Sequence, residues 1–133
     1  MFMNIKLQTN CGNQVLEFVN AERYDDGSGF SAFIKVVSKG FAANVFVTFG
    51  EWPMEQFVEN LQKCNIELSG EATLKPEWDN WYLKVSITHI GAVVIRGYLY
   101  EPGHELSFVL ETDQTCLEPL IRDLKRWQNQ GNT

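Results

Sequence analysis

The sequence predicts an α+β fold in which four strands and a helix, ββββα, occur twice along the chain. Alternating apolar and polar residues, typical of half-buried antiparallel strands, recur over most of its length. Two segments instead carry apolar residues at three- and four-residue spacing, as amphipathic helices do. Each helical segment follows a strand and an acidic turn, first in "VFVTFGEWPMEQFVENL" (45–61) and again in "LSFVLETDQTCLEPLIRDL" (106–124). The helices would cover antiparallel sheets that otherwise expose an apolar face.

The first unit is expected over residues 1–66. Alternation predicts its strands at 3–7, 15–21, 30–36 and 43–49. Turn residues separate these strands at 10–13, 25–29 and 38–40. Pro53 suits the first position of the helix, because that position needs no N–H group and proline has none. The expected buried stripe of this helix consists of Met54, Phe57, Val58, Leu61 and Cys64.

The second unit is expected over residues 67–128. Its strands are predicted at 70–74, 81–87, 93–99 and 106–110. Pro102 and Gly103 occupy the central positions of a type II turn between the last two strands. Thr115 and Glu118 have the spacing of a capping box, so we expect Thr115 to cap the second helix. The buried stripe of that helix would be Leu117, Leu120, Ile121 and Leu124, and the following "QNQGNT" is expected to fray.

Length and composition favour one domain spanning 1–133. A chain of 133 residues can bury a core without metal or disulfide support. No apolar run is long enough to cross a membrane, and the N-terminus lacks the pattern of a signal peptide. We therefore expect a cytoplasmic protein with no membrane partner.

The charge of the chain limits its partners. The net charge is −6, and acidic residues gather between positions 51 and 79 and again between 101 and 118. Phosphate groups are bound by clustered Lys and Arg, so this composition argues against nucleic acid. The acidic tracts are either a solvated surface or a docking face that attracts a basic protein over long range.

The residues that usually carry catalysis are sparse. His89 and His104 are the only histidines, and both fall in predicted turns without a nucleophile motif beside them. Cys11, Cys64 and Cys116 are too widely spaced for a zinc site or a disulfide framework. No glycine-rich loop opens a helix as a phosphate site requires. We therefore expect no enzyme activity, no metal and no cofactor.

Four tryptophans lie near the ends of predicted elements, at positions 52, 78, 81 and 127. They either close the core or, in the case of Trp52 and Trp78, stand exposed among acidic residues. An exposed aromatic side chain surrounded by charge is typical of the few residues that dominate a protein interface.

Several segments resemble the WapI-like group of bacterial immunity proteins from polymorphic toxin systems, which includes immunity proteins for contact-dependent growth inhibition. The similar segments are "GFAANVFVTFGEWPMEQFVENL", the strand "GEATL", the long middle hairpin and the motif F-x-x-E-T-D-Q-T-x-L. The similarity covers residues 30–127. It implies a likeness to the Whirly fold, which has the same two ββββα units. Whirly proteins bind single-stranded DNA, and this acidic chain departs from them in charge.

The resemblance implies a cytosolic antidote that binds the C-terminal domain of a toxin delivered by a neighbouring cell. Together with the net charge, the acidic tracts and the missing catalytic residues, it leads us to expect one-to-one binding that occludes the active site of the toxin. Many such toxins are nucleases with basic clefts. The family has no fixed contact motif, so the local pattern supplies the candidate partner-binding residues Glu55, Glu59, Trp78, Asp79, Glu101 and Glu105. The alternative is a non-enzymatic domain that associates with itself through exposed sheet edges, which would make it a homo-oligomer.

Overall fold

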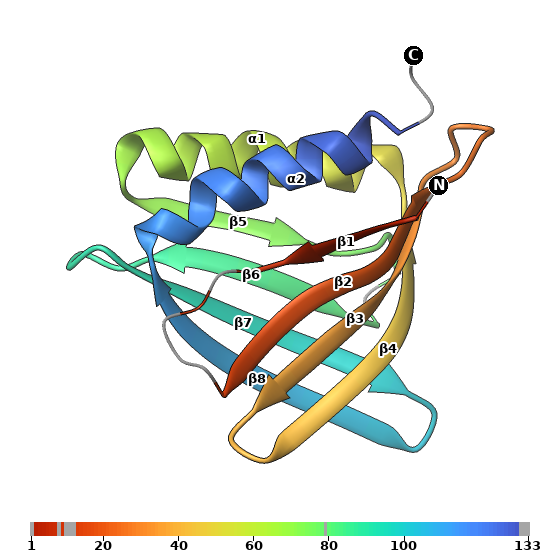
Figure 1. The fold of residues 1–133 in the computed structure, drawn as a ribbon, viewed down its shortest axis with the longest axis horizontal. Coiled ribbons are helices and arrows are strands. Elements are labelled where there is room, and N and C mark those ends of the chain that lie inside the picture. The colour runs from red at the N-terminus through yellow and green to blue at the C-terminus, as the bar shows by residue number, and fades with distance from the viewer. Residues whose placement is uncertain (1, 8, 10–12, 79, 131–133) are drawn as a thin grey trace.

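Two four-stranded antiparallel sheets and two helices make up the part of the chain that the computed structural model describes, residues 2–7, 9, 13–78 and 80–130 (Figure 1). The first unit consists of β1 (Met3–Lys6), β2 (Gln14–Arg23), β3 (Phe30–Ser38), β4 (Phe41–Phe49) and α1 (Glu51–Glu67). The second consists of β5 (Gly70–Leu74), β6 (Tyr82–Ile87), β7 (Ala92–Glu101), β8 (His104–Asp113), a 3₁₀ turn (Gln114–Cys116) and α2 (Leu117–Gln128). The predicted ββββα repeat is confirmed.

Each sheet is a meander in which every strand pairs with the next strand along the chain. Side chains alternate between the two faces of a strand, so the register decides which residues are buried together. In the β3–β4 pair, Ile34 lies opposite Val45 on the buried face, and Phe33 lies opposite Phe46 on the outer face. Gly103, in the hairpin between β7 and β8, has a φ of +85°, the angle that the predicted type II turn needs.

The two helices lie side by side at one end of the sheets (Figure 1). α1 runs along β5 of the second sheet, whereas α2 runs along β1 and β2 of the first sheet. The helix of each unit therefore packs against the sheet of the other unit. Both helices bury the stripes that the sequence predicts, and Trp127 extends the stripe of α2 by one further turn.

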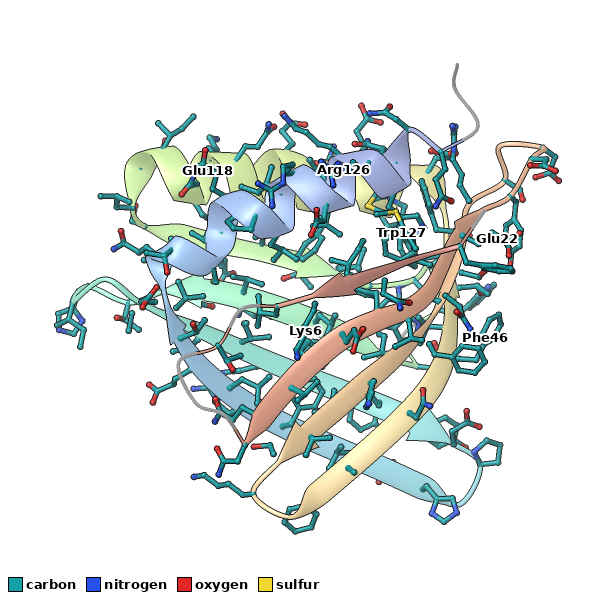
Figure 2. The ribbon with its side chains drawn as sticks, viewed as in Figure 1. Lys6, Glu22, Phe46, Glu118, Arg126 and Trp127 are labelled. Atoms are coloured by element: carbon teal, nitrogen blue, oxygen red, sulfur yellow. The ribbon has the colours of Figure 1, made fainter. Side chains whose placement is uncertain are left out.

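One cluster of buried residues joins both sheets and both helices. Trp127 packs into this cluster below the end of α2 (Figure 2), with its ring centroid 5.2 Å from that of Phe18, 5.7 Å from that of Phe30 and 5.4 Å from that of Phe49. The ring of Phe49 packs in turn against that of Trp81, with 5.8 Å between the ring centroids. The indole N–H of Trp127 donates a 3.0 Å hydrogen bond to the backbone carbonyl of Glu22, so its one polar atom is satisfied.

The expected fraying after α2 is wrong for residues 128–130. The side-chain oxygen of Gln130 accepts a 3.0 Å hydrogen bond from the backbone N–H of Arg23, and the Gln130 carbonyl accepts one of 3.3 Å from the guanidinium of Arg23. These bonds tie the end of α2 to β2. The remaining three residues of the predicted tail lie outside the described residues.

The expected cap of the second helix is also wrong. Asp113 accepts a 2.9 Å hydrogen bond from the backbone N–H of Thr115, and the Thr115 hydroxyl donates to the same carboxylate. A 3₁₀ turn therefore precedes α2, which begins at Leu117 rather than at Thr115. Asp113 therefore occupies the capping position, and its carboxylate accepts from the Thr115 N–H that Glu118 would have bonded in the predicted capping box. Pro119 lies in the first turn of α2, as expected.

Candidate partner-binding surface

An open groove of about 710 Å³ separates the first turns of α1 from the chain that follows β5. On the helix side it is lined by Trp52, Gln56 and Asn60, which lie on one flank of α1 at four-residue spacing. Across the groove lie the end of β5 and the segment 75–77. The start of α1 is two residues earlier than the sequence predicts, so Pro53 is the third helical residue and still lies in the first turn.

The four tryptophans divide into two pairs. Trp81 and Trp127 are 4% and 0% exposed and belong to the core. Trp52 and Trp78 are 69% and 81% exposed. Trp52 lines the groove, and Trp78 directly follows Glu77, which lines it from the other side. One large exposed aromatic side chain therefore lines the groove, and a second follows its opposite wall in the chain; exposed aromatic residues of this kind are typical interface anchors.

Acidic side chains accompany Trp52 along the outer side of α1. Glu55 and Glu59 are exposed, and their spacing from Trp52 by three and seven residues places all three on one side of the helix. Neither carboxylate has an ion-pair partner within the described chain. Both are therefore available to a cation from outside.

Glu51, at the start of the same helix, instead forms an ion pair within the protein. Its Oε1 lies 2.9 Å from Nη2 of Arg23 and accepts a 2.9 Å hydrogen bond from Nε of the same side chain. Arg23 also bonds to Gln130, so this cluster joins the start of α1, the end of β2 and the segment after α2. Lys75 also lines the groove, and its positive charge partly offsets the negative charge of the acidic residues there.

The six candidate residues do not form one site. Glu55, Glu59 and Trp78 lie on the elements that border the groove, and Asp79 lies outside the described residues. Glu101 and Glu105 instead line a second groove, of about 350 Å³, between the β7–β8 hairpin and β4. Figure 1 shows that hairpin at the end of the sheets away from the helices.

Glu105 has a local partner in this second groove. Its Oε1 accepts a 2.7 Å hydrogen bond from the Tyr98 hydroxyl, and this bond raises the pKa of Tyr98 because the phenol is held in its neutral form. The bond spans the β7–β8 pair on the outer face of the second sheet, where Tyr98 also lies 6.4 Å from Tyr82 between ring centroids.

Sequence reasoning missed one exposed aromatic pair. Phe33 and Phe46 lie on the outer face of the first sheet with ring centroids 5.2 Å apart and side chains 37% and 50% exposed (Figure 2). The signal was present in the strand pattern, because both residues occupy positions that the alternation assigns to the polar side. Gln56 and Asn60 were missed for another reason, since uncharged polar residues on the flank of a helix carry no distinctive pattern.

The groups that usually support catalysis are dispersed. His89 and His104 are both exposed, in separate hairpins. In residues 2–7, 9, 13–78 and 80–130, no three His, Cys, Asp or Glu side chains gather as a metal site would require. Within the same ranges, no helix is long and apolar enough to span a membrane. Cys64 and Cys116 are buried free thiols, and Cys11 lies outside the described residues.

Two antiparallel sheets and two helices define an α+β protein, and the exposed Trp52 beside an open groove, with free carboxylates on the same side of α1, gives it a candidate contact surface. The chain belongs to the immunity protein WapI-like family, whose family model matches residues 9–130. A comparison with curated proteins finds no match.

Two solved structures share the fold. One is a crystal structure of the MRP1/MRP2 proteins of Trypanosoma bruciei, with a TM-score of 0.57 and 10% identity over 96% of this chain and 83% of that one. The other is a guide-RNA-binding protein complex bound to a guide RNA, with a TM-score of 0.56 and 12% identity over 94% of this chain and 87% of that one. At such low identity these similarities concern the fold alone.

Proposed function

We propose that this protein is a cytoplasmic immunity protein that binds a cognate toxin domain one to one and neutralises it by covering its active site. Membership of the WapI-like family supports a toxin as the partner. The observation that carries the choice of surface is the groove at the start of α1, where Trp52 is exposed on the same side of the helix as the free carboxylates of Glu55 and Glu59, and where the exposed Trp78 directly follows the opposite wall.

The toxin is proposed to be a basic nuclease delivered by a neighbouring cell in contact-dependent growth inhibition. A net charge of −6 attracts a basic domain over long range and raises the rate of encounter. Nuclease clefts must hold phosphate groups and are therefore rich in Lys and Arg. An acidic helix inserted into such a cleft would displace the substrate from the charges that bind it.

The two kinds of side chain would contribute differently to the complex. Buried aromatic anchors near the centre of an interface account for most of its affinity, whereas charges at its rim mainly set the association rate and the orientation. We assign the first role to Trp52 and Trp78 and the second to Glu55 and Glu59. Asp79, Glu101 and Glu105 remain further candidates for charged contacts.

Co-expression with the toxin domain encoded beside this protein tests the proposal. Growth of the cells and co-purification of the two chains would be scored together. Rescue of growth with a stable one-to-one complex is the expected result. Full toxicity and no complex, with both chains expressed and soluble, would reject this pairing.

A nucleic-acid partner is less well supported, although one structure with this fold binds a guide RNA. The outer face of the second sheet carries Tyr82 and Tyr98, and stacked aromatic side chains suit single-stranded nucleic acid. Its cations are matched by acids on the same face, however, and Lys84 is paired with Glu71 at 3.1 Å. We therefore retain a protein as the partner.

Self-association is the second candidate function, and the exposed Phe33–Phe46 pair is the observation that favours it. An apolar pair on an outer sheet face is a common point of contact between copies of a chain. Light scattering on the isolated protein distinguishes the two functions. A stable dimer without affinity for a toxin would favour self-association.

A further inference from the structure

The sheets of this protein have four edge strands, β1, β4, β5 and β8. An edge strand presents unpaired N–H and C=O groups, and proteins usually protect such edges with charge, short length or cover. β1 has four residues and ends in Lys6, and β5 has five residues and lies along α1. β8 is longer but carries the exposed acids Glu105 and Glu111. These three edges are therefore protected.

The edge strand β4 is neither short nor charged, although the β7–β8 hairpin lies near its first half. It spans nine residues, "FAANVFVTF", without a charged residue, a proline or a glycine. Its even-numbered residues, from Ala42 to Thr48, are exposed. Aromatic and β-branched residues favour the extended conformation. A long, uncharged and β-prone edge is the form that readily accepts another strand.

A groove follows the first half of this edge. Residues 41–45 of β4 form one wall, and the β7–β8 hairpin forms the other, with a volume of about 350 Å³. Leu99 and Leu106 make the hairpin wall apolar, and Glu101 and Glu105 add negative charge to it. The lining therefore offers hydrogen-bonding backbone on one side and an acidic, partly apolar surface on the other.

A strand added beside β4 would meet two kinds of side chain along its length. Successive side chains of a strand point to opposite faces, and directly opposed side chains interact across neighbouring strands. In the second half of β4 the added strand would meet Phe46, which is half exposed beside Phe33. Along residues 41–45 it would meet the hairpin with Glu101 and Glu105. A segment with an apolar residue near Phe46 and basic residues beside 41–45 fits both.

We propose that the free edge of β4 pairs with an extended segment of the toxin domain, with an apolar residue over Phe46 and Lys or Arg against Glu101 and Glu105. This inference rests on the proposed function, because it names a second point of contact for the same partner. Strand addition supplies affinity through backbone hydrogen bonds and specificity through alternate side chains. It would also bring the hairpin acids into the interface, which the groove at α1 does not.

Hydrogen–deuterium exchange of the full chain, free and in the complex co-purified with the toxin domain, tests the proposal. A paired edge strand has its outward amides bonded, so exchange across 41–49 should slow by about tenfold or more on binding. Unchanged exchange of β4 in a complex that does form would overturn the inference and leave the proposed function standing. Absence of any complex would reject both.

A variant adds an independent test. Ala42→Lys places a charge on the exposed edge, as protected strands do, and should weaken toxin binding by about tenfold or more. Ser69→Lys adds the same charge at an exposed position between α1 and β5 and should change the Kd by less than about twofold. Equal effects of the two variants would overturn the inference. If the isolated protein formed a dimer in which the amides of β4 already exchanged slowly, the edge would pair with a second copy of the chain. That result would also overturn the inference.

Discussion

The four tryptophans have two kinds of surroundings: Trp81 and Trp127 close the core, whereas Trp52, in the first turn of α1, and Trp78, in the loop between β5 and β6, stand in solvent. For the two tryptophans that lie in helices, the difference arises from helix geometry. Trp52 lies on the outer side of α1 together with Glu55 and Glu59, whereas Trp127 continues the buried stripe of α2. The buried stripes of both helices could be predicted from the spacing of apolar residues, but the extension of the α2 stripe to Trp127 was not.

Replacing the exposed tryptophans should affect binding without affecting folding. Trp52→Ala or Trp78→Ala should each weaken toxin binding by about 2 kcal/mol, roughly thirtyfold in Kd, because anchors of this kind dominate interfaces. The free energy of unfolding should change by less than about 0.5 kcal/mol. Titration calorimetry and urea denaturation measure the two quantities.

The buried Trp127 provides the matched control. Trp127→Ala should lower the free energy of unfolding by about 3–5 kcal/mol, because it empties the space between Phe18, Phe30 and Phe49 and removes the hydrogen bond to Glu22. Toxin affinity that survives both exposed substitutions would remove the groove at α1 from the interface.

Charge reversal on α1 should alter the rate of association. The double variant Glu55→Lys/Glu59→Lys should slow toxin binding at low salt, since it replaces attraction by repulsion at the proposed contact. The difference from the unmodified protein should shrink as salt screens both charges. Stopped-flow measurements over a salt series give these rates.

Glu118→Lys is the control for that experiment. It reverses an exposed charge in the first turn of the other helix (Figure 2) and should slow association much less. The control changes the net charge by half as much as the double variant, so a slowing half as large, in the logarithm of the rate, would show that only the net charge matters and would contradict a specific role for α1.

The buried thiols define a third prediction at this scale. Burial, reinforced by nearby Asp113, raises the pKa of the Cys116 thiol to about 11 from an ordinary value of 9.0. The unfolded chain therefore ionises first as the pH rises. The Cys116 thiol therefore leaves the free energy of unfolding unchanged below about pH 9 and lowers it between pH 9 and 11.

Thiol labelling and denaturation check this prediction. In a Cys11→Ser background, Cys64 and Cys116 should react very slowly with a disulfide reagent at pH 8 in the folded state and rapidly in urea. The loss of stability between pH 9 and 11 should be smaller in Cys116→Ala. Rapid labelling of the folded protein would contradict the burial of both thiols.

At the scale of elements, the strands and the buried faces of the helices could be predicted, because the two-residue and three-to-four-residue periods are strong local signals. The entry into α2 could not. Thr115 and Glu118 have the spacing of a cap, but Asp113 takes the Thr115 N–H first. A cap formed by Thr115 and Glu118 competes at this point with a turn closed by Asp113. The position of Asp113 at the end of β8 favours the turn.

The contact between β7 and β8 also depends on one small residue. Gly97 lies opposite Phe108, and a Cβ atom at position 97 would lie 2.1 Å from the phenylalanine ring. The ring of Phe108 is itself buried, so it has little room to move. Because Gly97 has no side chain, the ring of Phe108 can lie directly over the backbone of β7.

Gly97→Ala should lower the free energy of unfolding by about 1–3 kcal/mol through overpacking. Phe108→Leu shortens the opposing side chain, so the double variant should be more stable than the sum of the two single changes predicts. Urea denaturation of the four proteins completes the cycle. Strictly additive losses would contradict a direct clash.

At the scale of the molecule, the doubled unit explains how the protein holds together. A sequence repeat suggests that each half is complete, yet α1 packs along β5 and α2 along β1 and β2. Neither half contains the helix that covers its own sheet. This exchange could not be predicted from local patterns, because both helices have suitable apolar stripes for either sheet.

Separate halves should therefore fail to fold alone. Residues 1–66 and 67–133, produced individually, should show weak circular dichroism or aggregate, since each exposes an apolar sheet face. Mixing them during refolding should restore native circular dichroism and a single cooperative transition. A half that unfolds cooperatively by itself would contradict this account of the core.

Because the helix that covers the first sheet belongs to the second unit, it is synthesised long after the sheet that it covers. Residues 3–49 leave the ribosome as a complete meander well before residues 117–128 exist to cover it. Until then the nascent chain carries an open apolar face and the uncharged edge of β4. The growing chain would therefore be prone to aggregation during this interval, and the native fold could form only when α2 has been translated.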